Sequence, residues 1–108
     1  MIQSHDGKTV TLINVFTVNP ADQERLVDLL AGATVGIVDQ AKGFISATLH
    51  RSVDGKKVAM YALWRSAEDY QAMRDDLRPL PFLEAALKIA KFEPGMYESV
   101  RMFRPPDG

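Results

Sequence analysis

Two segments of this chain have the alternation of β-strands but carry apolar side chains on both faces. In the first, Lys8 to Val18, one face consists of Val10, Leu12, Asn14, Phe16 and Val18, and the other of Thr11, Ile13, Val15 and Thr17. In the second, Lys57 to Arg65, the residues Ala59, Tyr61 and Leu63 alternate with Met60, Ala62 and Trp64. Strands of this kind belong in a sheet that is covered on both faces. The fold must therefore supply two covers.

Capping and turn residues indicate where the neighbouring elements begin. Asn19 and Pro20 suit the N-cap and the first position of a helix. Apolar residues follow at helical spacing, namely Leu26, Leu29, Leu30, Ala33 and Ile37. An Asp-Gly pair at 54–55 separates the β-patterned segments 44–52 and 57–65, which predicts a hairpin.

The second half of the chain repeats the helix-then-strand order. Ser66 and Asp69 resemble a capping box with Asp in place of Glu, and the apolar stripe of the helix they open is Tyr70, Met73 and Leu77. We expect a short helix over 82–91 and a last strand over 96–103. The resulting order is that of an α+β, ferredoxin-like split βαββαβ fold with an antiparallel sheet.

In that fold both helices cover the same face of the sheet, so the other apolar face needs a second cover. A second copy of the sheet would supply it, which predicts a homodimer. A monomer whose tail or loops cover the face is the alternative. We expect one domain over residues 1–108, with its core at about 8–103 and a tail at 104–108.

Composition excludes several function classes. The 13 Lys and Arg residues against 14 Asp and Glu residues provide no strong field for nucleic acid or a membrane surface. The chain has no cysteine, and its two histidines, His5 and His50, are far apart, so no metal site is expected. His50 shares a predicted strand face with Phe44, Ser46 and Thr48, where a hydrogen-bonded or solvent-facing imidazole is expected. Neither a membrane span nor a signal peptide is apparent, which predicts a cytoplasmic protein.

Asn14 and Trp64 are the candidate catalytic residues. Asn14 interrupts an apolar strand face, and a buried amide without partners costs about 1–3 kcal/mol. Asn14 is therefore either a core residue bonded to a neighbour or a donor that points into an internal cavity. Trp64, the only tryptophan, lies on the helix-facing side of its strand and is either plain core or part of the same cavity.

Further side chains are expected to line a substrate cavity between sheet and helices: Phe16, Met60, Tyr70, Met73 and Phe82. Helix-to-sheet packing explains the helical members of this set equally well. Arg74 and Arg78 most simply describe a solvated helix face.

Three segments together resemble the antibiotic biosynthesis monooxygenase family: Leu12-Ile13-Asn14-Val15-Phe16-Thr17-Val18, Gly43-Phe44-Ile45-Ser46-Ala47-Thr48, and Tyr61-Ala62-Leu63-Trp64-Arg65-Ser66-Ala67-Glu68-Asp69-Tyr70. The resemblance extends over about residues 8–103. It implies a dimeric α/β barrel, in which two ferredoxin-like sheets pack face to face and each has a cavity under its helices. It also implies oxidation of a phenol, anthrone or dihydroquinone to a quinone with O2 and no cofactor, with Asn14, Trp64 and Tyr70 at the cavity.

The chain departs from the family pattern at three positions. Met60 and Glu84 stand near the places where some of those enzymes have a second Asn and an Arg. Haem-degrading members need a histidine near Ala86, and no histidine follows His50, so haem degradation is disfavoured. The predicted function is a cofactor-independent monooxygenase acting on a small aromatic substrate. An isomerase of a small carbonyl compound and a non-catalytic ligand-binding dimer are the alternatives.

Overall fold

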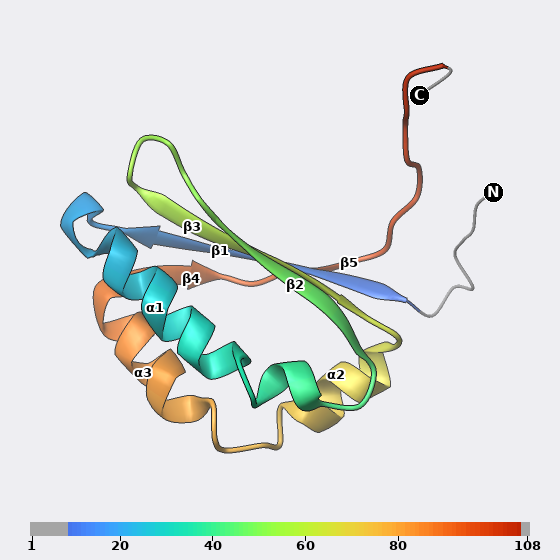
Figure 1. The fold of residues 1–108 in the computed structure, drawn as a ribbon, viewed down its shortest axis with the longest axis horizontal. Helices are drawn as coiled ribbons and strands as arrows, with labels where there is room; N and C mark the ends of the chain where they lie inside the picture. The colour runs from blue at the N-terminus through green and yellow to red at the C-terminus, as the bar shows by residue number, and fades with distance from the viewer. Residues whose placement is uncertain (1–8, 107–108) are drawn as a thin grey trace.

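The computed structural model describes residues 9–106, and its helices lie together on one face of a single sheet (Figure 1). The strands are β1 Val10–Val18, β2 Phe44–Arg51, β3 Lys57–Trp64, β4 Ala90–Glu93 and β5 Met96–Tyr97. The helices are α1 Gln23–Thr34, α2 Ala67–Met73 and α3 Leu80–Ile89, with short 3-10 turns η1 Pro20–Asp22 and η2 Val38–Gln40. The strand order is β2-β3-β1-β4, β5 also pairs with β1, and all pairs are antiparallel. This confirms the predicted α+β, ferredoxin-like fold.

β1 is the central strand, and its register with β3 decides which side chains face the helices. The pairing runs from Val10 opposite Trp64 to Thr17 opposite Lys57, and Asn14 lies opposite Met60. Because side chains alternate along a strand, the even-numbered residues of both strands share the helix-facing side, which we call the inner face. The largest fully buried side chains of the described residues are Trp64, Leu26, Leu30 and Val58. The core therefore lies between the inner face and the helices, as the alternation predicts.

Local signals account for most element boundaries. The Ser66 Oγ accepts a hydrogen bond from the Asp69 N–H at 3.0 Å, which confirms the predicted N-cap of α2. The predicted hairpin also forms, and Gly55 takes the positive φ of 83° that its turn requires. Asn19 caps Ala21 at 3.1 Å, but it opens η1 rather than the first turn of α1. Lys8, the predicted start of the first strand, lies outside the described residues.

The prediction that Phe44 shares a face with Ser46, Thr48 and His50 is wrong. A register shift between Phe44 and Ser46 places Phe44 opposite Trp64 and Ser46 opposite Leu63. One extra residue in a strand reverses the alternation beyond it, so Phe44 lies on the inner face while the other three lie on the outer face. Gly43, with φ of 86°, allows the sharp entry into this strand.

The end of the chain also differs from the prediction. The helix forms over Leu80–Ile89 and runs directly into β4, where Ala90 pairs with Val18. Pro94, which has no N–H to donate, interrupts the edge strand, so pairing resumes only at β5. After Tyr97 the chain leaves β1, and the predicted strand over 96–103 is confined to Met96–Tyr97. α2 likewise ends at Met73. Leu77, which was predicted to belong to its apolar stripe, therefore lies outside the helix and is 70% exposed.

The cap at Ser66 provides a test of how α2 is held. Replacing Ser66 by Ala removes the acceptor for the Asp69 N–H and should lower the free energy of unfolding by about 1 kcal/mol. Urea denaturation at one protein concentration measures this. Ser99→Ala, at an exposed position in the C-terminal segment, is the matched control and should change stability by much less. Equal effects of the two variants would contradict the assigned role of the cap.

Candidate active site

A cavity of about 360 Å³ lies between the inner face of the sheet and the helices. The sheet contributes alternate residues of its two central strands, namely Leu12, Asn14 and Phe16 from β1 and Met60, Ala62 and Trp64 from β3. The opposite wall comes from the helices, mainly Tyr70 and Met73 of α2 and Leu80, Leu83 and Leu87 of α3. Its volume falls in the usual range of small-molecule sites, roughly 300–1,000 Å³.

The structure brings six of the seven predicted site residues together at this cavity. Asn14, Phe16, Met60, Trp64, Tyr70 and Met73 all line it. Phe82 does not: its ring lies against Gly32 of α1, where an added Cβ would come within 2.6 Å of it. Phe82 is therefore part of the α1–α3 contact. The missing side chain of Gly32 makes room for it.

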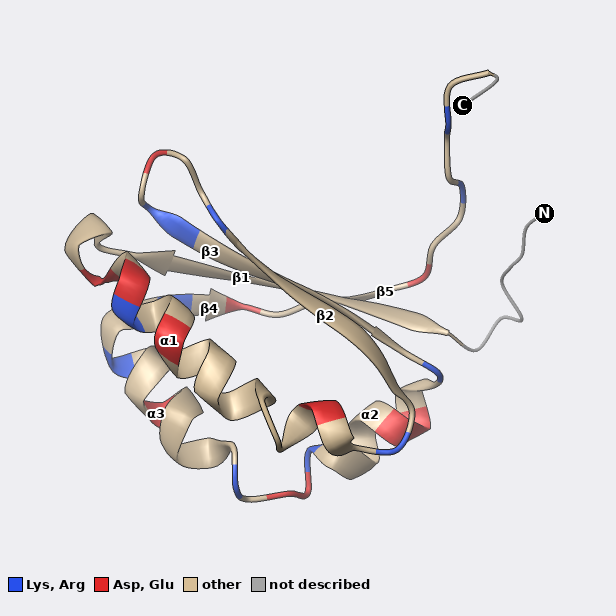
Figure 2. Ribbon diagram, in the orientation of Figure 1, with Lys and Arg blue, Asp and Glu red and all other residues tan. Residues whose placement is uncertain are grey.

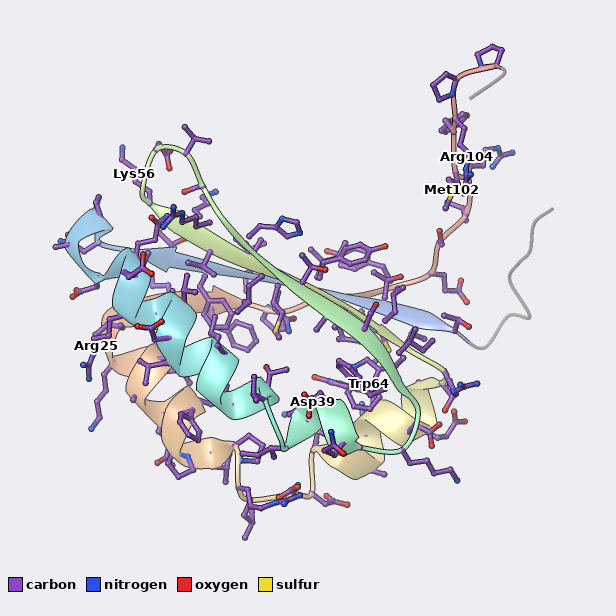
Figure 3. The ribbon with its side chains drawn as sticks, in the orientation of Figure 1. Arg25, Asp39, Lys56, Trp64, Met102 and Arg104 are labelled. Atoms are coloured by element: carbon purple, nitrogen blue, oxygen red, sulfur yellow. The ribbon has the colours of Figure 1, made fainter. Side chains whose placement is uncertain are left out.

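Aromatic rings form two groups on the cavity wall. Trp64, which is 1% exposed, has the Phe44 ring edge-on at 5.4 Å and the Tyr70 ring at 5.6 Å and 68°. In Figure 3, Trp64 is seen between β2 and α2. Nearer the other end of β1, Phe16 stacks on Phe92 at 4.6 Å. Edge-on and stacked rings of this kind hold one another in place, so the walls offer flat apolar surfaces to a ligand.

Three polar groups in this apolar setting have no hydrogen-bond partner among residues 9–106. The Asn14 Oδ1 is buried and unpartnered. The indole N–H of Trp64 and the hydroxyl of Tyr70 also make no hydrogen bond in that part of the chain. Buried polar groups are nearly always paired in folded proteins, so the Asn14 Oδ1, the buried one of the three, calls for an explanation. A ligand with its own donors and acceptors would pair them.

Arg74, Asp76 and Glu84 line the cavity on the helix side. The middle of the sheet, by contrast, carries no Lys, Arg, Asp or Glu (Figure 2). Arg74 places its guanidinium carbon 6.0 Å from the centre of the Tyr70 ring. Asp76 accepts hydrogen bonds from Arg78 at 2.6–3.1 Å, and these lower the pKa of the Asp76 carboxyl to about 2. Glu84 of α3 lines the cavity without an ion-pair partner in the described part of the chain.

Several lining residues were missed by the sequence analysis. Phe44 was assigned to the wrong face because the bulge between Phe44 and Ser46 cannot be recognised from the alternation of apolar and polar residues. Phe92 lies between the predicted helix over 82–91 and the predicted strand over 96–103 and was assigned to neither, and Arg74 was interpreted as part of a solvated face. Glu84 has the one signal that sequence reasoning could have used. It stands in the helical stripe Leu80, Leu83, Glu84 and Leu87, which is otherwise apolar.

No group of three or more His, Asp or Glu side chains suited to a metal ion occurs among the described residues. Within the same residues, no helix is both long and apolar enough to cross a membrane.

The sequence of this chain matches a known enzyme family. A sequence profile of the antibiotic biosynthesis monooxygenase family matches residues 9–76. The chain is also 39% identical to tetracenomycin-F1 monooxygenase of Streptomyces glaucescens over 93 residues, which cover 86% of this chain and 83% of that protein. The chain belongs to the antibiotic biosynthesis monooxygenase family.

Two solved structures share the fold over most of their length. The monooxygenase from the gene ActVA-Orf6 of Streptomyces coelicolor, in complex with nanaomycin D, superposes with a TM-score of 0.80 at 28% identity and covers 91% of this chain and 93% of that one. SnoaB, a cofactor-independent oxygenase from Streptomyces nogalater, has a TM-score of 0.70 at 24% identity and covers 91% of this chain and 98% of that one. The second likeness concerns the fold alone.

The effect of Arg78 on the pKa of Asp76 can be tested by titration. In Arg78→Gln the Asp76 carboxylate loses its cationic donor, so its pKa should rise from about 2 toward the ordinary value of 3.8. Because the folded-state pKa is depressed, the stability that this pair contributes is present above the ordinary pKa and is lost as the pH falls toward 2. Carboxyl-carbon NMR titration measures the shift.

Asp54 is the internal control for this titration. The Lys56 N–H and the Ser52 hydroxyl lower its pKa in the hairpin, far from Arg78 in the sequence. Its titration should be the same in both proteins. An unchanged Asp76 titration in Arg78→Gln would show that Arg78 does not cause the shift.

Proposed function

We propose that this protein is a cofactor-independent monooxygenase that oxidises an aromatic phenol, anthrone or dihydroquinone with O2 to a quinone. The observation that carries the proposal is the unpartnered, buried Asn14 Oδ1 in a cavity walled by aromatic rings. Such a site offers hydrogen bonds only to a bound ligand, and its walls favour a flat one. The monooxygenase relatives support O2 as the second substrate.

The chemistry requires little of the protein beyond binding, charge stabilisation and exclusion of water. An anthrone-type substrate loses a proton, and the electron pair left on the carbanion reduces O2. The resulting carbon-bound hydroperoxide loses water to leave a carbonyl group. One O2 is consumed, one oxygen atom enters the product and the other leaves as water. The Asn14 Nδ2 would donate a hydrogen bond to the substrate oxygen that gains charge as the proton leaves, and the Asn14 Oδ1 would accept one from a substrate hydroxyl. The Trp64 N–H would donate to a different substrate oxygen, further along the cavity.

The distance between these two residues supports an extended substrate. Trp64 lies opposite Val10, four residues before Asn14 on the same face of β1. At about 3.3 Å per residue the two positions are roughly 13 Å apart along the strand. A ligand in contact with both would run along the cavity, with Phe44 and Tyr70 at one end and Phe16 and Phe92 at the other. A fused-ring compound fits this geometry better than a single ring.

Asn14→Leu tests the role of the amide. Leucine has a similar shape without polar atoms, so the variant keeps the packing and removes the unpartnered oxygen. We expect turnover of a dihydroxyanthrone, followed by O2 consumption, to fall about 10²-fold or more. The melting temperature should be unchanged or raised, because a buried group without a partner is removed.

Trp64→Phe is the companion variant, since it keeps an aromatic ring and removes the N–H.

Normal turnover per folded protein in Asn14→Leu would exclude Asn14 from the mechanism. Turnover of a carbonyl compound without O2 uptake would instead indicate an isomerase. Saturable binding without any turnover would indicate a ligand-binding protein.

We also propose that a second copy of the chain covers the outer face of the sheet. Ile13, Val15 and Leu63 on this face are only half-buried, and Tyr61 and Tyr97 are 42% and 52% exposed. The segment after β5 extends away from the body of the molecule (Figure 1), with Phe103 85% exposed. Burial of these apolar groups against a copy of themselves would stabilise both chains.

Val15→Asp tests the proposed dimer. It places a charge in the middle of the outer face, and burying it at a sheet-on-sheet contact would be strongly unfavourable. Light scattering coupled to size exclusion should show a dimer for the unmodified chain and monomer or aggregate for the variant. Val53→Asp, in the fully exposed hairpin turn, is the control and should remain dimeric. A monomeric unmodified chain at micromolar concentration would refute the dimer.

A further inference from the structure

The proposed oxidation needs a proton acceptor, and the cavity border offers few. Four of its lining residues have titratable side chains: Tyr70, Arg74, Asp76 and Glu84. Tyrosine and arginine side chains hold their protons at neutral pH. Asp76 is bonded to Arg78 through both of its oxygens, which lower its pKa to about 2 and make it a weak base. Glu84 is the remaining carboxylate.

Glu84 occupies a position that helical periodicity would give to an apolar residue. Leu80, Leu83, Glu84 and Leu87 are spaced as i, i+3, i+4 and i+7 on α3, and all four line the cavity. Glu84 lines the cavity and is also exposed to solvent, as Leu80 and Leu87 are. It therefore interrupts the helix wall much as Asn14 interrupts the sheet wall.

No other charge neutralises Glu84 in the part of the chain that the structure describes. Lys88 lies one turn further along α3 and makes no ion pair with it, and neither does Arg74 across the cavity. α1, which packs against α3, contributes only uncharged residues to the lining: Leu30, Ala33 and Thr34. The carboxylate is exposed and free to accept a proton from a ligand and to return it to water.

We propose that Glu84 is the general base of this site, accepting the proton that the substrate carbon loses before it reacts with O2. The C–H bond breaks, its electron pair stays on the substrate as a carbanion, and the proton forms an O–H bond on the Glu84 carboxylate. The Asn14 Nδ2 donates a hydrogen bond to the oxygen onto which that charge is delocalised. The inference rests on the proposed function, because it assigns the first step of the same reaction.

Anaerobic hydrogen exchange tests this step without oxygenation. A dihydroxyanthrone is incubated in D2O without O2, and proton NMR follows the replacement of its methylene hydrogens by deuterium. The unmodified protein should accelerate the exchange. Glu84→Gln, which has the same shape, should slow the protein-catalysed exchange at neutral pD about 10²-fold, and the loss should diminish as the pD rises and solvent base takes over.

Two controls make the result specific. Glu68→Gln, at an exposed position of α2 that does not line the cavity, should exchange like the unmodified protein. Quenching of the single tryptophan, Trp64, by the anthrone should give the same Kd within about threefold for Glu84→Gln, which excludes a loss of binding.

The outcomes separate this inference from the proposed function. Exchange that depends on Glu84, without O2 uptake in air, would support the base and contradict the monooxygenase. Exchange in Glu84→Gln equal to that of the unmodified protein would overturn the assignment. If Glu84→Gln slowed the exchange by the same factor at every pD, Glu84 would have a positioning role and the assignment would also be overturned. It would be overturned as well if the unmodified protein did not accelerate the exchange.

Discussion

The pairing of β1 with β3 is the interaction on which the site depends. It is the longest ladder of the sheet and is continuous from Val10 opposite Trp64 to Thr17 opposite Lys57. A slip of one residue in β1 would turn Asn14 and Phe16 to the outer face and Ile13 and Val15 toward the helices. The inner face buries Leu12 and Phe16 against the helices, so the register that builds the core also sets the cavity lining. Fold and site thus share one determinant.

The cavity brings together two polar residues that interrupt apolar faces. Asn14 interrupts an apolar strand face and Glu84 an apolar helix face, and neither has a partner among the described residues. Groups that break a local rule without compensation in the folded chain are typical of functional sites. Here they lie on opposite walls of one cavity, which connects two exceptions that would look unrelated along the sequence. The monooxygenase family to which the chain belongs provides a reaction that would use both.

The two faces of the sheet differ in how far helices shield them from water. Helices close the inner face and leave a space lined by rings, whereas the outer face carries Ile13, Val15 and Leu63 under no helix. α2 has only seven residues, and the chain from Arg74 to Pro79 crosses the cavity border without regular structure. Charged side chains, among them Arg74 and the Asp76–Arg78 pair, are concentrated at this border. The interior is thus apolar and its rim polar, as in most small-molecule sites.

Short-range patterns in the sequence were enough to predict the element order, the inner face of β1 and β3, the cap at Ser66 and the family. These properties depend on neighbours within a few residues, because alternation, capping and turn chemistry are local. Six of the seven predicted site residues line the cavity, and alternation and helix spacing were enough to place them on its walls. The bulge that turns Phe44 inward, the division of the last strand into β4 and β5, and the position of Phe82 against Gly32 depend on which distant segments meet. That Asn14 lacks a partner and that Glu84 lines the same cavity were likewise decided by the tertiary structure, since hydrogen bonding of a buried group depends on every element packed around it.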